Sequence, residues 1–237
     1  MSASVDPLMI WSMTATAWLA SGALAAGCLA AICGLQRQRR RIAGLTASLE
    51  ACNERALAHA RELERQALED DLTGLHNRRF MDTDLPREFE RTQRFGREFT
   101  LAILDVDGFK QINDRYSHQL GDRVLADVAA ILQSACRTMD GVVRYGGDEF
   151  VLYFPEAQLS TGRNICQRVL KRVHSHGWQR LAPDLAVTLS IGLASSHGAE
   201  SAIDLLEMAD SRLRSAKQAG KDRICSEDAA APLVNVA

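Results

Sequence analysis

Acidic residues stand at two places where the sequence predicts the ends of β-strands. Asp105 and Asp107 directly follow the apolar run 99–104, and Asp148 and Glu149 follow a Gly-Gly pair. Carboxylates displayed on neighbouring strands suit Mg²⁺, which takes oxygen ligands and commonly shares them with substrate phosphates. Glycines at the turn let a phosphate-bearing ligand approach the backbone closely. The pattern indicates metal-assisted phosphoryl or nucleotidyl transfer, although on these residues alone an acidic surface hairpin is an equally good interpretation.

The elements that must position these acids follow from the hydrophobic pattern. We expect strands over residues 99–104, 141–145, 149–154 and 186–194, and helices over residues 81–94, 121–136, 161–174 and 202–219. The first of these strands is nearly continuously apolar, which is typical of a strand buried on both faces. The glycines at positions 146 and 147 indicate a β-hairpin. Strands that alternate with helices around a hairpin predict an α+β or α/β domain with one sheet and helices packed against it.

Four motifs, in order, resemble those of the GGDEF family of diguanylate cyclases. They are DLTGLHNRR from Asp71, DVDGFKQINDRYSHQLGD from Asp105, RYGGDEF from Arg144 and AKQAGKD from Ala216. Their order and spacing agree with the family over about residues 70–226, and four ordered motifs are far more specific than one. The resemblance implies an α+β domain similar to the nucleotidyl cyclases and polymerase palms, with a central sheet flanked by helices. It also implies synthesis of cyclic di-GMP from two GTP by a homodimer, with the active site between two copies.

The resemblance also implies a metal and catalytic site. Its metal ligands are Asp105, Asp148, Glu149 and the carbonyl of Val106, which would hold two Mg²⁺ per GTP, with Mn²⁺ as an alternative. Asp148 and Glu149 are the catalytic residues in this comparison. Glu149 lies near the attacking hydroxyl, either as a metal ligand or as a base.

Seven further residues are implied to bind GTP. Asn113 and Asp122 would recognise guanine, because an amide and a carboxylate complement a hydrogen-bonding edge that adenine lacks. The others would contact the phosphates or the loop around them: Phe109, Lys110, His118, Lys217 and Lys221. Two positions depart from the family pattern. Ser117 stands where glycine is usual, and Lys221 replaces arginine and so loses the bidentate fork.

Several residues within the motifs are expected to be structural. Asp107 would cap a loop, and Arg144 would support the hairpin. We expect Asp71 to pair with Arg78 at the start of the domain, and Trp178 to pack in the core rather than to stack on a base.

The tetrapeptide from Arg137 to Asp140 is an RxxD at the position of the family's inhibitory product site. The guanidinium can pair with a phosphate or with the Hoogsteen edge of guanine, and the carboxylate can accept from a guanine N–H. The alternative is a solvated helix end, because RxxD is a common tetrapeptide, but its placement, separated from Gly146 by five residues, favours the product site. The alternative function for the whole chain is a catalytically silent receptor for cyclic di-GMP, which the intact acidic residues argue against.

A charge-free run of 28 residues, Leu8 to Leu35, precedes these motifs. As a helix it reaches about 42 Å, more than the roughly 30 Å of a hydrocarbon core. Arginines follow it at positions 37 and 39–41 and none precedes it, which favours a cytoplasmic side after residue 35. We therefore expect a short extracytoplasmic segment over 1–7, a transmembrane helix over 8–35 and a single-pass protein of the bacterial inner membrane with a cytoplasmic catalytic domain. A cleaved signal peptide is the alternative, but no positive segment precedes the run.

Residues 36–69 have the composition of a helix. Seam positions three and four apart hold apolar or small residues at Ile42, Leu45, Leu49, Cys52, Ala56 and Leu63, with His59 and Gln66 as polar interruptions. This spacing predicts a parallel coiled coil, with a single solvated helix as the alternative. The catalytic domain is expected over 70–226, with a flexible tail over 227–237.

Overall composition excludes two classes of protein. The formal net charge is −2, so no basic excess supports nucleic-acid binding. Six cysteines are scattered without a CxxC pair, so neither a disulfide framework nor a zinc knuckle is expected.

Overall fold

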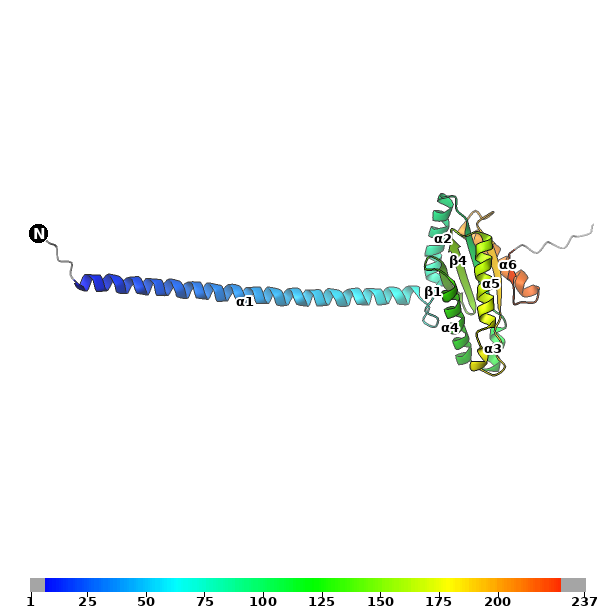
Figure 1. Ribbon diagram of the computed structural model, residues 1–237, viewed down its shortest axis with the longest axis horizontal. Coiled ribbons are helices and arrows are strands. Elements are labelled where there is room, and N and C mark those ends of the chain that lie inside the picture. Colours follow the sequence, from blue (N-terminus) through cyan, green and yellow to red (C-terminus); the bar gives the residue numbers. More distant parts are fainter. Residues whose placement is uncertain (1–6, 227–237) are drawn as a thin grey trace, which may run out of the picture. The chain divides into compact units, whose positions relative to one another are not determined.

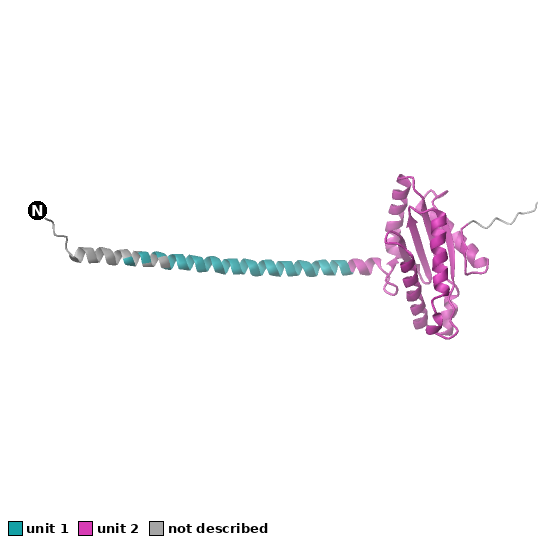
Figure 2. Cartoon of the chain, viewed as in Figure 1, with its two compact units in different colours: residues 1–62 teal, residues 63–237 magenta. Residues whose placement is uncertain are grey.

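The computed structural model describes residues 7–226; before residue 26 it describes only the side chains of Trp18, Ser21 and Leu24. The chain divides into two compact units, Met1–Glu62 and Leu63–Ala237 (Figure 2). The predicted tail over 227–237 lies outside the described residues, as do residues 1–6 of the predicted N-terminal segment.

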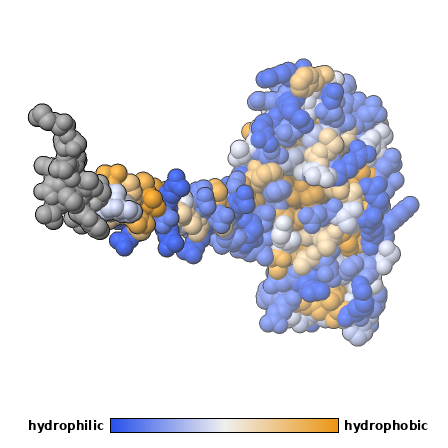
Figure 3. Space-filling view, turned by 60° about the vertical axis from the view of Figure 1, so that its left-hand side comes forward, coloured by the Kyte–Doolittle hydropathy of each residue, from blue (hydrophilic) through white to orange (hydrophobic). Residues whose placement is uncertain are grey.

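Helix α1 extends over Pro7–Leu68 and forms nearly all of the described part of the first unit. Its described large apolar side chains are exposed, and Figure 3 shows hydrophobic and hydrophilic residues mixed along this part of the helix. A helix whose apolar side chains are exposed gains little from hydrophobic burial. The exposed large apolar side chains at the predicted seam positions are Ile42, Leu45, Leu49 and Leu63.

The predicted membrane-spanning helix over residues 8–35 is wrong, and so is the single-pass inner-membrane location inferred from it. Among the residues that the structure describes, no helix is long and apolar enough to cross a membrane. The physical reason is that a segment without charged residues is not necessarily hydrophobic enough to enter a membrane. Fifteen of these 28 residues are Ala, Gly, Ser or Thr, whose small side chains gain little from transfer into hydrocarbon.

The second unit is built on one mixed sheet of strand order β1-β3-β4-β2-β5-β6. The strands are β1 His76–Asn77, β2 Phe99–Val106, β3 Gly141–Gly146, β4 Glu149–Pro155, β5 Leu189–Ser195 and β6 Ile224–Cys225. The central pairs β3–β4, β4–β2 and β2–β5 are antiparallel, and the two short edge strands pair in parallel. All eight residues of β2 are buried, as the nearly continuous apolar run 99–104 predicts for its first six.

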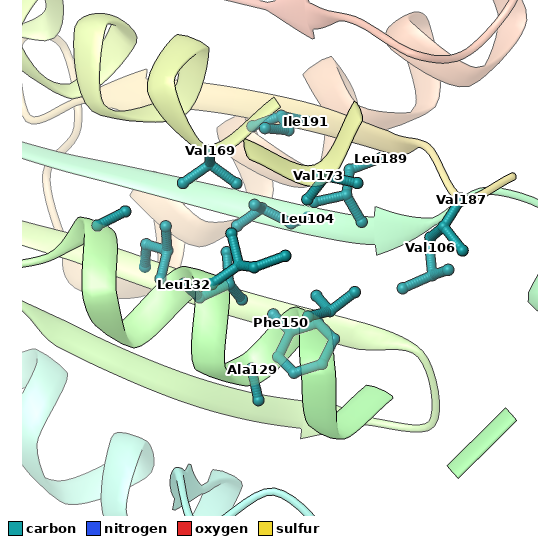
Figure 4. Packing of buried hydrophobic residues seen from close by; sticks show 14 of the residues in the cluster. Leu104, Val106, Ala129, Leu132, Phe150, Val169, Val173, Val187, Leu189 and Ile191 are labelled. Atoms are coloured by element: carbon teal, nitrogen blue, oxygen red, sulfur yellow. The ribbon is translucent and has the colours of Figure 1, made fainter. Parts of the chain in front are cut away.

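Helices cover both faces of this sheet (Figure 1). They are α2 Arg78–Arg94, α3 Phe109–Arg115, α4 His118–Ala135, α5 Leu159–His174 and α6 Ala202–Gln218, with a short 3₁₀ helix at Trp178–Arg180. Side chains alternate across β2, so Leu104 belongs to one apolar cluster and Ile103 to the other. The first cluster lies under α4 and α5 (Figure 4), and the second lies under α2 and α6.

The predicted central sheet with flanking helices is confirmed, and the differences lie at its margins. Strand β5 begins at Leu189, three residues later than predicted, and helix α3 was expected only as a phosphate-contacting loop. The two-residue strands β1 and β6 were not predicted. Elements this short carry no periodic pattern, and they form because tertiary structure presents a strand edge to them.

Candidate active site

Strand register brings the predicted acidic residues to one end of the sheet. Asp105 on β2 is paired with Glu149 on β4 and, on its other side, with Ser190 on β5. The backbone N–H of Val106 donates to the carbonyl of Asp148 at 3.2 Å, which ties the hairpin turn to the end of β2. Carboxylates separated by some 44 residues in sequence thus meet at the tips of two adjacent strands.

Asp105 is nearly buried and is paired with a lysine. Its carboxylate lies 2.7 Å from the ammonium group of Lys217, and the residue is only 8% exposed. Burial raises the pKa of Asp105; Lys217 opposes this shift, while the nearby charges of Asp148 and Glu149 add to it. The charges of both acids thus act on Asp105, whose strand neighbour is Glu149.

The chemistry of this group fits a hard divalent cation. Its donors are carboxylate and carbonyl oxygens, and a cationic nitrogen already lies against Asp105. As positioned, the described His, Cys, Asp and Glu side chains form no cluster of three or more that could hold a metal ion by themselves. A cation here would therefore need oxygens from the backbone or from a nucleotide phosphate, which is the usual manner of Mg²⁺ binding.

A glycine allows α6 to bring Lys217 to this site. A Cβ atom at Gly192 of β5 would lie 2.1 Å from the carbonyl oxygen of Ala209 and 2.2 Å from the amide nitrogen of Leu213. Helix α6 therefore packs directly on the backbone of β5. Leu213 is buried at this contact, and Lys217 follows it one helical turn later.

Asp107 has the structural role that we expected. Its carboxylate accepts hydrogen bonds from the hydroxyls of Thr188 at 2.8 Å and Ser190 at 2.6 Å, and from the backbone N–H of Asp222 at 3.1 Å. These donors use both of its oxygens. Asp107 therefore ties the segment after α6 to the end of β2, next to the predicted metal ligands.

The predicted guanine-binding residues lie where α3 meets α4. A Cβ atom at Gly121 would lie 1.9 Å from Oδ1 of Asn113 and 3.2 Å from the ring of Phe109, so only glycine fits there. Oδ1 of Asn113 is buried and has no hydrogen-bond partner. Buried acceptors of this kind are uncommon and call for a donor from a ligand or a water molecule. Asp122, the next residue, is exposed beside it.

The remaining predicted nucleotide-binding residues lie on three separate segments. Phe109 and Lys110 begin α3, His118 begins α4, and Lys221 follows α6. Ser117 has extended backbone, with φ of 166°, and its hydroxyl accepts from the N–H of Leu120 at 3.2 Å. The departure from glycine at this position therefore causes no strain.

The pairing expected at the start of the domain involves different residues. Asp70, not Asp71, accepts two hydrogen bonds from Arg144, each 3.0 Å long. Arg144 also donates to the carbonyl of Gly147, at 2.8 Å and 3.1 Å, so this pair supports the hairpin as expected. The guanidinium of Arg78 lies 4.7 Å from the centre of the Tyr145 ring instead of on Asp71. The predicted pair of Asp71 with Arg78 is therefore wrong. Side chains of adjacent residues point in different directions, and it is Asp70 that faces an arginine, Arg144.

The RxxD residues lie apart from the acidic site, beside a pocket of about 370 Å³. Asp140 accepts from the backbone N–H of Arg137 at 2.7 Å, which closes the turn after α4. Burial raises the pKa of Asp140, an effect that the charges of Arg137 and Arg168 oppose. The pocket is also lined by His76, whose Nδ1 atom is buried without a partner.

Trp178 is 2% exposed and packs in the core, as expected.

Residues 67–223 match the family described as "Diguanylate cyclase, GGDEF domain". The chain is 36% identical over 167 residues to diguanylate cyclase DgcP of Pseudomonas aeruginosa, covering 70% of this chain and 25% of that protein. It is 37% identical over 156 residues to diguanylate cyclase DosC of Escherichia coli, covering 65% of this chain and 34% of DosC. The chain thus spans about a quarter to a third of the length of these relatives.

Solved structures agree with this match. The coiled coil and GGDEF domain of DgcB from Caulobacter crescentus, in complex with c-di-GMP, superposes with a TM-score of 0.71 at 31% identity, over 80% of this chain and 98% of that one. Diguanylate cyclase SiaD of Pseudomonas aeruginosa, in complex with its activator SiaC, gives a TM-score of 0.63 at 31% identity, over 91% and 84%. The chain belongs to the GGDEF family of diguanylate cyclases.

Proposed function

We propose that this chain condenses two GTP into cyclic di-GMP with release of two pyrophosphates. The observation that carries the proposal is the group of carboxylates at the tips of β2 and β4, with the Lys217 ammonium 2.7 Å from Asp105. Such a group can bind a divalent cation and, through it, a triphosphate. Family membership and relatives named as diguanylate cyclases support the same reaction.

The residues would act as follows. Asp105, Asp148, Glu149 and the carbonyl of Val106 would hold divalent metal ions, Mg²⁺ or Mn²⁺, which offset charge on the triphosphate when bound. Lys217 would leave Asp105 for a phosphate oxygen, and Lys221 would bind beside it. Glu149 lies at the hairpin tip, where a carboxylate can accept the proton of the attacking 3′-hydroxyl.

The base would be recognised between α3 and α4. The unpartnered Oδ1 of Asn113 can accept an N–H of guanine, and Asp122 offers a second acceptor nearby. Adenine presents a different donor pattern at this edge and would leave these acceptors unpaired, which disfavours ATP. Phe109, Lys110 and His118 would complete the contacts around the nucleotide.

The reaction requires two nucleotides, so the active unit would be a homodimer. Each copy would hold one GTP, and each 3′-hydroxyl would attack the α-phosphate held by the other copy. The exposed stripe on α1 supports this proposal, because a parallel coiled coil over residues 36–69 raises the effective concentration of the second catalytic domain.

The same chain would bind its product at Arg137 and Asp140. Support comes from the pocket of about 370 Å³ beside them, which is large enough for a purine base. The alternative function, a silent receptor that uses only this pocket, is not favoured, because the chain retains Asp105, Asp148 and Glu149 at the other site.

Incubation of the purified full chain with GTP and either Mg²⁺ or Mn²⁺, with products identified by mass spectrometry, tests the reaction. We expect cyclic di-GMP from the native chain and at least about a hundredfold less from Glu149→Ala. Glu207→Ala, which removes an exposed acid on α6, is the matched control and should retain native activity. Absence of the dinucleotide, or its undiminished formation by Glu149→Ala, would refute the proposal.

A further inference from the structure

Two consecutive residues after α6 have left-handed backbone although neither is glycine. Lys221 has φ of 63° and Asp222 has φ of 48°. Such a conformation is uncommon for residues with a Cβ atom, and it persists where the surroundings hold it in place. Lys221 is one of the residues proposed to bind phosphate, so the surroundings of this segment bear on the site.

Hydrogen bonds from three directions hold the segment. The N–H of Lys221 donates to the carbonyl of Ala216 at 3.0 Å, at the end of α6. The N–H of Asp222 donates to Oδ2 of Asp107 at 3.1 Å, and Nε2 of His174 donates to Oδ1 of Asp222 at 2.7 Å. Asp222 is therefore held in place through its backbone N–H by Asp107 and through its side chain by His174.

Both groups that grip Asp222 are fixed in the fold. Asp107 follows the end of β2 and also binds the hydroxyls of Thr188 and Ser190. His174 is the last residue of α5, and the preceding residue, Val173, is fully buried beside Leu189 of β5 (Figure 4). The segment after α6 is thus attached to β2 and to α5, two elements that the sheet holds in register.

We propose that His174 and Asp222 are positioning residues for Lys221. This inference rests on the proposed function, in which Lys221 binds a phosphate of GTP. A lysine side chain has many rotamers, so its usefulness in binding depends on a fixed backbone. The His174–Asp222 contact supplies that fixed backbone and also occupies a carboxylate that would otherwise stand unpaired next to a phosphate-binding residue.

Three variants separate the parts of this contact. His174→Ala removes the hydrogen bond to Asp222 and leaves the charge of Asp222. Asp222→Gly removes the same hydrogen bond, and glycine adopts the left-handed backbone readily. Asp222→Asn removes the charge but keeps an acceptor for His174, and asparagine tolerates this conformation. The matched control is Asp127→Ala, which removes another carboxylate–histidine pair, Asp127 of α4 with His176 at 3.1 Å, just beyond the end of α5.

The first measurement is GTP turnover by the full chain. We expect His174→Ala and Asp222→Gly to raise KM for GTP about fivefold or more with kcat within about twofold of native, a loss of ground-state binding. Asp222→Asn and Asp127→Ala should keep KM within about twofold of native. In a Lys221→Met background, His174→Ala should have no further effect, because a positioning residue acts only through the residue it positions.

The second measurement is amide hydrogen exchange over residues 220–223 in the nucleotide-free chain. Exchange should become faster in His174→Ala and Asp222→Gly and stay native in Asp127→Ala. Unchanged exchange, or an equal loss in the Lys221→Met background, would overturn the inference. If Lys221→Met itself leaves KM for GTP unchanged, the proposed phosphate-binding role of Lys221 is refuted. The exchange measurement still tests whether the His174–Asp222 contact holds residues 220–223 in place.

Discussion

At the residue scale, the decisive feature is a carboxylate that the fold buries among like charges. Asp105 is 8% exposed and lies near Asp148 and Glu149, so its ionised form needs a cation. Lys217 supplies one at 2.7 Å. Removing Lys217 would leave the charge of Asp105 uncompensated, which is costly for a nearly buried carboxylate.

The contact between Asp70 and Arg144 links the first motif to the GGDEF hairpin. Burial tends to raise the pKa of Asp70, but hydrogen bonds from Thr73 and Arg144 prevail and lower it from 3.8. A lowered pKa means that the folded state favours the ionised carboxylate. The stabilisation is therefore present above about pH 3.8 and is lost as the pH falls through the lower folded-state value.

We predict that Asp70→Asn lowers the free energy of unfolding by about 1–3 kcal/mol at pH 7. The difference from native should shrink as the pH falls below 3.8, because the native carboxylate then loses its advantage. Urea denaturation across this pH range measures it. Asp71→Asn, at the exposed neighbouring residue, is the control and should stay within about 0.5 kcal/mol of native.

Product inhibition also belongs to this scale. We predict that Arg137→Ala raises the inhibition constant for cyclic di-GMP about tenfold or more, because it removes a charge-assisted hydrogen bond to the ligand. Initial rates at several product concentrations measure this effect. Arg123→Ala, which removes an exposed arginine from the other end of α4, should leave inhibition native. Native inhibition in Arg137→Ala would show that the RxxD is only a helix end.

At the scale of elements, the site depends on how closely α6 approaches β5. Gly192 is the reason for the close approach, since a Cβ atom there would overlap the backbone of Ala209 and Leu213. The same approach sets the position of Lys217, one turn further along α6. Core packing and the electrostatics of the site are therefore linked through one helix.

We predict that Gly192→Ala lowers the free energy of unfolding of the catalytic domain by about 1–3 kcal/mol, because α6 must move away from the sheet. Activity should fall more than stability alone explains, since Lys217 moves with α6. Thermal unfolding and GTP turnover below the transition measure the two effects. Gly44→Ala lies in α1 with open space around it and should leave the unfolding of the catalytic domain unchanged.

At the scale of the whole molecule, the chain combines a folded catalytic domain with a helix whose apolar side chains are exposed. Ile42, Leu45 and Leu49 are each at least 61% exposed in the single chain. Their spacing suits a coiled coil between two copies. If α1 pairs in this way, catalysis by two domains becomes dependent on the stability of that coiled coil.

We predict that Leu49→Glu lowers specific activity at least about tenfold at nanomolar chain concentration. Raising the chain concentration should restore part of this activity. A charge at a seam position weakens pairing, so dimers form only as concentration rises. Activity against dilution, with sedimentation velocity in parallel, measures it. Ala47→Glu, on the opposite side of the predicted seam, is the control. Equal dilution curves for all three chains would contradict the coiled coil.

The sequence alone determined the central architecture and the identity of the acidic residues. The buried run of β2 and the Gly-Gly turn each have a strong local cause, namely continuous hydrophobicity and backbone freedom. The absence of charge over residues 8–35 was a poorer basis for predicting a membrane-spanning helix, because small residues were treated as if they were strongly hydrophobic. The contact between Asp70 and Arg144 was beyond local pattern, since it depends on β3 pairing with β1 and so bringing Arg144, 74 residues later in the chain, next to Asp70.

What the tertiary structure decided is which distant groups come into contact. The sequence placed Lys217 in a phosphate-binding motif, but only the packing of α6 on Gly192 sets its ammonium against Asp105. Likewise, nothing in the local pattern joins His174 to Asp222, 48 residues later. Local sequence fixes backbone preference and side-chain chemistry, whereas contacts between remote residues depend on strand register and helix approach, which the whole chain sets together.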